Sequence, residues 1–177
     1  GPALNLHMIP YFTDKGLDPT IAVLTTTILF ITGAIGSLVF GFLAERFSIR
    51  QILSTNYLMV GLGVAGLLLV DSTPKAFTWA VYMGLVQGGG FTLNQVLFAD
   101  YFGRDSLGAI RGVISPIQLG ANAIGPLAAA YAYDVLGNYF AIFLAFALLR
   151  LFSAGLVLLA KQPNKSTIVP RQPKLKE

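Results

Sequence analysis

The chain has 177 residues, of which 55% are hydrophobic and 11% are charged, and its formal net charge is +4. Soluble domains carry about 25% charged residues, so this composition excludes a soluble domain with a polar surface and predicts a surface that faces lipid. The absence of cysteine excludes disulfides and cysteine-ligated metals. We expect no nucleic-acid partner, because the positive residues lie in predicted loops and in the tail, where membrane topology accounts for them.

Uncharged stretches mark the predicted transmembrane helices. A helix needs about 20 predominantly apolar residues to cross a bilayer, and lipid requires helices because it cannot satisfy open backbone groups. We therefore predict an all-α membrane protein, a helical bundle of five full spans preceded by a partial one. The predicted bounds are 3–13 for the partial segment and 19–44, 51–71, 75–101, 107–136 and 138–160 for the full spans. Asp18 before Pro19 is a typical helix-start signal.

The two ends of the sequence differ from the full spans. The segment 3–13 is apolar but too short to cross a bilayer, and position 1 is not methionine. The simplest interpretation is a fragment that begins partway through a helix, and a short interfacial or re-entrant segment is the alternative. Residues 162–177 contain prolines and little apolar surface. We expect a transmembrane half-domain over residues 1–161, followed by a disordered tail.

Lys and Arg side chains concentrate on alternate connections between the predicted spans. The larger set consists of Arg46, Arg50, Arg104, Arg111, Lys161, Lys165, Arg171, Lys174 and Lys176. The other connections contain only Lys15 and Lys75. Cytoplasmic loops carry the excess of positive residues, so we predict that the larger set and the carboxyl terminus lie in the cytoplasm.

Small residues recur at every fourth position in two of the spans. Gly33, Ser37 and Gly41 share one face of the first full span, and Gly84 and Gly88 do so in the third. Small residues let helices approach closely in lipid, so we predict packing contacts at these positions.

The connection after the first full span reads Gly41-Phe-Leu-Ala-Glu-Arg-Phe-Ser-Ile-Arg50. It resembles a signature loop of the major facilitator superfamily of secondary transporters, roughly G-x-L-A-D-R-x-G-R-R/K. The matching positions are Gly41, Leu43, Ala44, Arg46 and Arg50, with Glu45 in place of the usual aspartate. The resemblance implies the carboxyl-terminal half of a twelve-helix fold. Segment 3–13 would end helix seven, and the amino-terminal six-helix half would be missing.

In that superfamily the loop is taken to act as a conformational latch. The residues that we expect to contribute to gating are Gly41, Glu45, Arg46, Arg50, Asp100 and Arg111. We expect Glu45 to accept hydrogen bonds from the helix start at 106–111, with Arg111 adding an ion pair, and Arg46 and Arg50 to reach Asp100. The alternative is a set of ordinary solvated loop charges.

A second resemblance is narrower. The sequences Asp100-Tyr-Phe-Gly-Arg104 and Ala109-Ile-Arg-Gly112, with the opening His7-Met-Ile-Pro-Tyr11, are similar to loops of bacterial monocarboxylate and oxalate–formate carriers. This resemblance implies a monocarboxylate-like organic anion moved with protons, and a bacterial inner-membrane location. Carriers of that group often place a basic residue in helix eight or eleven. Here the helix-eight span holds none, and the helix-eleven span holds only Arg111 at its start, which the charge count assigns to the preceding connection.

The first resemblance implies that helices seven, eight, ten and eleven line the transport cavity. Polar groups are costly in a bilayer and therefore invite a functional interpretation. The predicted substrate-binding residues are His7, Tyr11, Gln87, Phe91, Asn94, Gln118 and Asn122. The alternative for the amides is that they hydrogen-bond helices together. His7 suits proton coupling because histidine changes charge near neutral pH, although an interfacial position is the alternative.

One basic residue interrupts the last span. Arg150 lies too deep to reach water easily, so we expect it to face protein, with a structural partner favoured over substrate.

The favoured function is transport of a small polar solute, with the lipid bilayer and the missing half as partners. The alternative is a non-transporting membrane receptor or assembly subunit on the same fold. We do not predict an enzyme, because the spans hold no carboxylate pair, metal-ligand cluster or Ser/His/Asp set. Gly88-Gly-Gly90 also lacks the Gly-Lys-Ser/Thr of a phosphate loop. We accordingly expect no catalytic residue, no cofactor and no metal.

Overall fold

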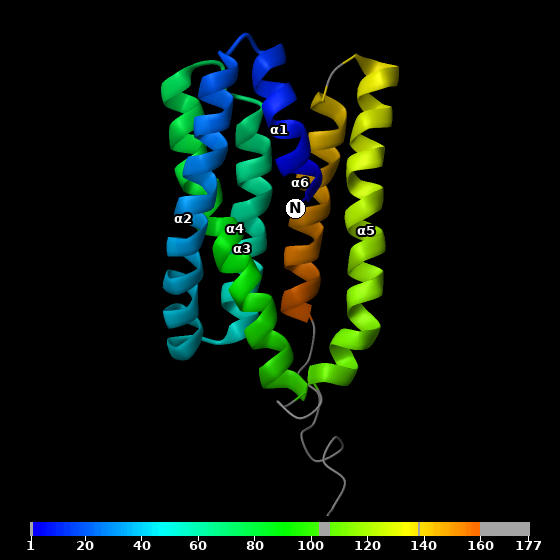
Figure 1. Cartoon of the computed structure of the whole chain (residues 1–177). Helices are drawn as coiled ribbons and strands as arrows, with labels where there is room; N and C mark the ends of the chain where they lie inside the picture. Colours follow the sequence, from blue (N-terminus) through cyan, green and yellow to red (C-terminus); the bar gives the residue numbers. More distant parts are fainter. Residues whose placement is uncertain (1, 103–106, 138, 160–177) are drawn as a thin grey trace, which may run out of the picture.

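The computed structural model describes residues 2–102, 107–137 and 139–159, which form a bundle of six α-helices (Figure 1). The helices are α1 (Pro2–Asp14), α2 (Pro19–Arg46), α3 (Ile49–Leu67), α4 (Thr73–Phe102), α5 (Leu107–Leu136) and α6 (Phe140–Leu159). Each helix covers one of the apolar stretches of the sequence, as predicted. The predicted tail over residues 162–177 lies outside the described residues.

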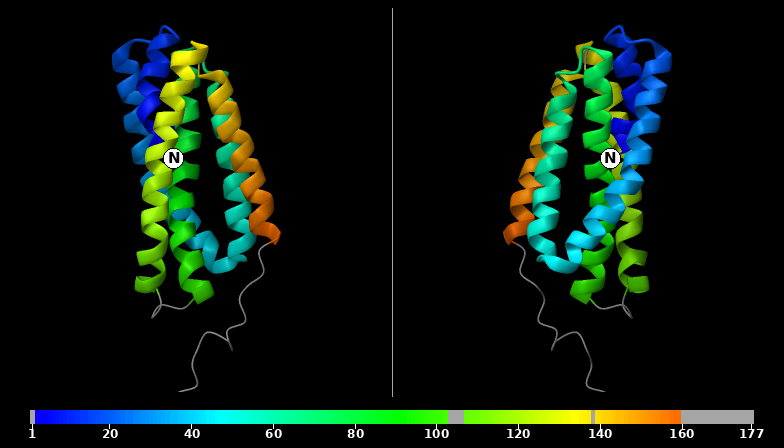
Figure 2. Two further views of the ribbon diagram at one scale, coloured as in Figure 1. Left: turned by 90° about the vertical axis from the view of Figure 1, so that its right-hand side faces the viewer. Right: turned by 90° about the vertical axis from the view of Figure 1, so that its left-hand side faces the viewer.

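Consecutive helices run antiparallel along one bundle axis (Figures 1 and 2). At the lower end in Figure 1, α2 and α4 end and α3 and α5 begin; we call it the arginine end because it carries Arg46, Arg50 and Arg111. The upper end carries acidic residues that include Asp14 and Asp71, and we call it the aspartate end. The described arginines of the larger predicted set therefore gather at one end, whereas Lys15 and Lys75 lie at the other, as the charge count predicted.

The start of α2 shows why the helix begins where the sequence signal placed it. The Asp18 carboxylate accepts a hydrogen bond from the backbone N–H of Thr20 over 2.7 Å, and Pro19 occupies the first turn. Hydrogen bonds from the Thr20 side chain and backbone lower the pKa of the Asp18 carboxyl. Gly16 adopts a φ of 82° in the preceding turn, a conformation that glycine takes without steric cost.

α3 is shorter than the predicted span 51–71. The backbone N–H groups of Leu69 and Val70 donate to carbonyls three residues earlier, over 3.0 and 3.1 Å. These tighter turns end the α-helix at Leu67 and lead the chain into α4.

α2 and α4 pack along a stripe of small residues. A Cβ atom at Gly36 would overlap the backbone of Leu85, and one at Gly88 would overlap the backbone of Gly33. The hydroxyl of Ser37 donates to the carbonyl of Gly88 over 3.0 Å. The prediction of close packing is therefore confirmed at Gly33, Ser37, Gly84 and Gly88, but not at Gly41, where an added Cβ atom would make only an ordinary contact.

α3 and α6 form a second antiparallel pair, in which side chains of α3 bind backbone carbonyls of α6. The Ser54 hydroxyl donates to the carbonyl of Ala154 over 2.8 Å, and the Arg50 guanidinium donates to the carbonyl of Leu158. Both the donors and the acceptors are four residues apart, so the contact repeats once per turn on each helix.

Aromatic side chains fill the core near the aspartate end. The Tyr139 ring lies 6.1 Å from that of Tyr11 and 5.4 Å from that of Phe143, and Phe12 meets Trp79 edge-on at 6.0 Å, between ring centroids. Offset and edge-on rings are the favoured arrangements. These contacts anchor α1, which has only 13 residues, to α4 and α6.

The exterior of the bundle is apolar. Three of the described helices, α2, α5 and α6, are long and apolar enough to cross a membrane by length and composition. Their exposed side chains include Phe30 and Leu38 on α2 and Phe152 on α6. α3 and α4 are more polar, and their amides, such as that of the buried Asn56, meet other helices. The predicted fold class, an all-α membrane helical bundle, is confirmed.

Candidate functional site

A polar pocket of about 350 Å³ lies between α3, α4, α5 and α6, and we call it the central pocket. Its lining residues are Asn56, Tyr57, Val60, Gln87, Gly90, Phe91, Asn94, Gln95, Gln118 and Arg150. The volume is within the range of about 300–1,000 Å³ that is typical of small-molecule sites. Four of the predicted substrate-binding residues, Gln87, Phe91, Asn94 and Gln118, are brought together here.

Hydrogen bonds fix the wall formed by α3 and α4. The Tyr57 hydroxyl donates to Asn94 Oδ1 over 3.0 Å, and Asn94 Nδ2 donates to the carbonyl of Gly90 over 2.6 Å. One turn away, Asn56 Nδ2 donates to the carbonyl of Val86 over 2.8 Å. Asn94 therefore both joins helices and lines the pocket, so the two interpretations of the amides are compatible.

Arg150 brings a positive charge to the central pocket from α6. Its guanidinium carbon lies 5.4 Å from the centroid of the Tyr57 ring, which is a cation–π contact. Such contacts contribute about 0.5–2 kcal/mol, whereas an arginine at the centre of a membrane helix costs about 2.5–3.5 kcal/mol. The residue faces protein, as expected from the sequence, but the ring alone does not offset the cost of its position.

Two glutamines add hydrogen-bonding capacity to the pocket, one from α4 and one from α5. Gln87 Nε2 is buried and has no hydrogen-bond partner among the described residues, which is costly for an amide donor. Gln118 reaches the pocket from α5. Among the described residues, no group of three or more His, Cys, Asp or Glu side chains is placed to hold a metal ion.

The other predicted substrate-binding residues lie elsewhere. His7 Nε2 donates to the carbonyl of Pro126 over 3.2 Å, and His7 Nδ1 lies 3.3 Å from the Tyr139 hydroxyl. Tyr11 belongs to the aromatic core, where its hydroxyl donates to the carbonyl of Leu67 over 3.1 Å. Asn122 is exposed on α5. The first two therefore have structural partners near the aspartate end.

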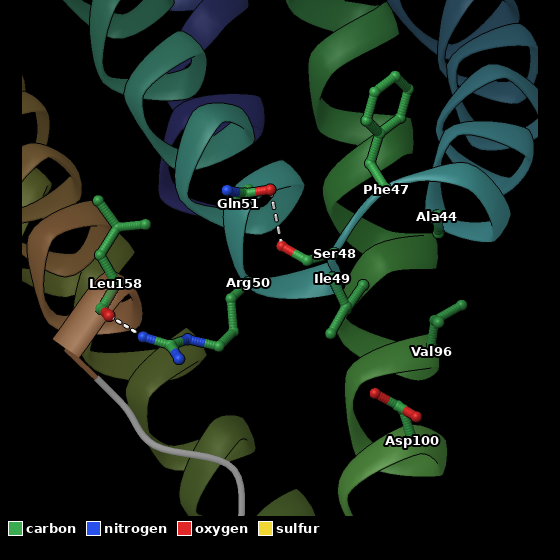
Figure 3. Close-up of a pocket in the computed structure, with 9 residues that line it drawn as sticks. All are labelled: Ala44, Phe47, Ser48, Ile49, Arg50, Gln51, Val96, Asp100 and Leu158. Carbon is green, nitrogen blue, oxygen red and sulfur yellow. Dashed lines mark hydrogen bonds between the residues drawn. The ribbon is translucent and has the colours of Figure 1, made fainter.

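A second pocket of about 590 Å³ lies at the arginine end, and Figure 3 shows it. Its lining residues are Ala44, Phe47, Ser48, Ile49, Arg50, Gln51, Val96, Asp100 and Leu158. The Arg50 side chain points toward Leu158 and away from Asp100 in Figure 3. Ser48 donates to Gln51 Oε1 over 2.9 Å, which holds the short turn between α2 and α3.

The predicted gating residues gather at the arginine end, but with partners that differ from those expected. Arg111 donates to Gln95 Oε1, and Arg50 donates to the last turn of α6. Glu45 and Arg46 are exposed. The expected partner of Glu45, the helix start at 106–111, falls partly on residues 103–106, which lie outside the described residues.

The remaining gating residue, Gly41, lies beside α4. A Cβ atom there would be 3.7 Å from Thr92 Cγ2, an ordinary contact, so Gly41 does not enforce the helix separation at its position.

Sequence reasoning missed part of the central pocket. Asn56 and Tyr57 stand in an uncharged stretch of α3, which was assigned no polar role, and Gln95 lies next to the singled-out Asn94. The signal that could have found them is the rarity of amides in a membrane span.

Comparisons with known proteins agree with this architecture. The family model of the Major Facilitator Superfamily matches residues 3–177. The chain is 26% identical over 181 residues to monocarboxylate transporter 12-B of Danio rerio, and the match covers 96% of this chain and 38% of that protein. It is 27% identical over 173 residues to monocarboxylate transporter 12 of Rattus norvegicus, with coverages of 94% and 36%. For the Homo sapiens protein the identity is 26% over 172 residues, with coverages of 93% and 33%.

The chain thus spans between 33% and 38% of the length of these three relatives. The family match, in contrast, extends over nearly the whole chain, and it agrees with a helical membrane bundle and a signature loop at the arginine end. The chain therefore belongs to the Major Facilitator Superfamily.

Proposed function

We propose that this chain is the carboxyl-terminal half of a secondary transporter that moves a small organic anion with protons by alternating access. The observation that carries the proposal is the central pocket, where amides and one cation meet inside an otherwise apolar bundle. Secondary transporters bind their solutes near the bilayer midplane at sites between helices. The relatives named above are monocarboxylate transporters, which supports a monocarboxylate-like anion as the solute.

The surface of α5 supports the existence of a second six-helix half. Between Arg111 and Ile124, every side chain except Ile114 is exposed. Gln118 and Asn122 lie in this stretch, and amides facing lipid would lack hydrogen-bond partners. An amino-terminal half packed against α5 would cover them and complete the central pocket.

The contacts at the arginine end support a role in gating. Arg50 joins α3 to α6 and Arg111 joins α5 to α4, and such contacts would break when this end of a transporter opens. We propose that Gly41, Glu45, Arg46, Arg50, Asp100 and Arg111 together form the gate. We propose that this end and the carboxyl terminus lie in the cytoplasm, because cytoplasmic loops carry the excess of positive residues. The bacterial inner membrane stays a prediction, because the relatives named above come from animals.

The test is uptake into proteoliposomes by the complete transporter, by which we mean this chain with the amino-terminal half that the proposal requires. We expect saturable uptake of L-lactate driven by an inward proton gradient and abolished by a protonophore. Protein-free vesicles are the control. A complete transporter that takes up no small carboxylate would refute the proposal and favour the alternative, a non-transporting receptor or assembly subunit.

The candidate for proton coupling is His7, the histidine of this chain, which joins α1 to α5 and to Tyr139 just before α6. In the same vesicles, His7→Ala should weaken the dependence of uptake on the proton gradient. Unchanged proton dependence would remove His7 from the mechanism.

A further inference from the structure

Arg150 occupies the middle of α6 and faces the interior of the bundle. It lies about 14–15 Å along the helix axis from either end of α6, at 1.5 Å per residue. Ala147 and Ala154, one turn before and one turn after it on the same face, are both buried. The cation is therefore held inside the protein, away from the arginine-rich end.

The described contacts leave the guanidinium with unused donors. Arg150 lies over the Tyr57 ring, which offers a π face but accepts no conventional hydrogen bond from the five N–H groups. No Asp or Glu of the described residues forms an ion pair with Arg150. The ion pair between Lys75 and Asp71 lies at the aspartate end.

The central pocket is lined both by the half-buried Arg150 and by a second unpartnered donor. Gln87 Nε2 is buried on α4 and has no acceptor among the described residues. The lining contains further amides, of which Asn56 also presents a buried acceptor without a partner, Oδ1, and the apolar side chains of Val60 and Phe91, but no carboxylate. A fixed cation, a buried amide N–H and apolar walls are the complement of a small molecule with one carboxylate and a short apolar body.

We infer that Arg150 is the carboxylate-binding residue of the central pocket, with Gln87 as a second donor and Tyr57 orienting the guanidinium. The inference rests on the proposed function, since it names the group that recognises the anion. It gives Arg150 on α6 a substrate-binding role, whereas the sequence favoured a structural partner for this residue. A bound carboxylate would supply the counter-charge that the described residues around Arg150 do not.

The experiment compares Arg150→Gln and Arg150→Lys with the wild type in the complete transporter. Uptake of L-lactate gives KM and the maximal rate, and competition by lactate and by its neutral amide, lactamide, gives a carboxylate-to-amide preference. The same two compounds are tested for stabilisation of the purified protein against thermal unfolding. Ser153→Ala is the matched control, because its hydroxyl bonds only to the Leu149 carbonyl of its own helix.

We expect Arg150→Gln to raise KM for lactate about tenfold or more and to abolish the carboxylate-to-amide preference in both assays. Arg150→Lys should retain part of the preference, and Ser153→Ala should retain all of it. A structural role would lower the amount or stability of Arg150→Gln while leaving the preference intact, and that outcome overturns the inference.

The two proposals can fail separately. If the wild type takes up no carboxylate, the proposed function is refuted, and the thermal assay still decides whether Arg150 binds the carboxylate. Equal stabilisation of the wild type by lactate and lactamide would refute the inference about Arg150.

Discussion

Replacing Gly36 by alanine should force α2 away from α4, because the added methyl group has no room. A Cβ atom at Gly36 would overlap the O, C and Cα atoms of Leu85, all of which belong to the backbone of α4. Backbone atoms cannot rotate aside as the end of a flexible side chain can. The two helices must therefore separate along the stripe where they approach most closely.

The magnitude is a balance of opposing effects. Alanine is favoured over glycine within a helix by about 1 kcal/mol. Overpacking costs about 1–3 kcal/mol, and weakening of the nearby hydrogen bond from Ser37 to Gly88 costs about 0.6 kcal/mol more. We expect Gly36→Ala to lower the free energy of unfolding by about 0.6–2.6 kcal/mol.

Two other glycines calibrate the measurement. A Cβ atom at Gly155 on α6 would meet nothing within 4 Å, so Gly155→Ala should be neutral or stabilising by up to about 1 kcal/mol. At Gly61 the nearest atoms, at 3.0 and 3.2 Å, belong to the Leu151 side chain, which can shift, so Gly61→Ala should fall between the other two. Equilibrium unfolding of the complete transporter in mixed micelles, followed by circular dichroism, gives the three values. If Gly36→Ala and Gly155→Ala have the same free energy of unfolding, the reasoning from the close approach of α2 and α4 at Gly36 is refuted.

Two further predictions concern the ends of the bundle. Arg50→Ala removes the hydrogen bond to the Leu158 carbonyl at the arginine end. A cysteine introduced at the half-buried Val96 should then react faster with a maleimide than the same cysteine in the protein that keeps Arg50, and this chain has no natural cysteine to interfere. An unchanged rate would contradict a role of Arg50 in holding this end closed. Asp18→Ala should lower the melting temperature at pH 7. Because hydrogen bonds from Thr20 lower the pKa of Asp18 from its ordinary 3.8, the stabilisation exists above that pH and is lost as the pH falls through the folded-state value. The difference between the two proteins should therefore disappear in strong acid, and a constant difference would count against the cap.

The helices and their polarity could be predicted from the sequence because lipid permits few alternatives. Long uncharged stretches must be helical, short connections make neighbours antiparallel, and positive residues gather at one end. The spacing of Gln87, Phe91 and Asn94 also predicted one face of α4, and these side chains do line one pocket.

Contacts between α3 and α6 could not be predicted in the same way. The acceptor for Arg50 is a backbone carbonyl, which every residue has, so no sequence signal marks it. The contact of Arg150 with Tyr57 depends on the register between helices that are distant in sequence, and hydropathy does not encode that register. Charges at the arginine end suggested partners of opposite charge, whereas the observed acceptors are an amide and a carbonyl.

The backbone acceptor of Arg50 also affects how the sequence of this protein can vary. Leu158 is exposed, and replacing its side chain leaves its carbonyl in place, so almost any residue except proline nearby would preserve the contact. Arg50 has no such freedom, because its side chain provides the donor. Related sequences would therefore constrain position 50 while position 158 drifts. Methods that detect contacts from correlated substitutions would miss this pair even though it joins two helices.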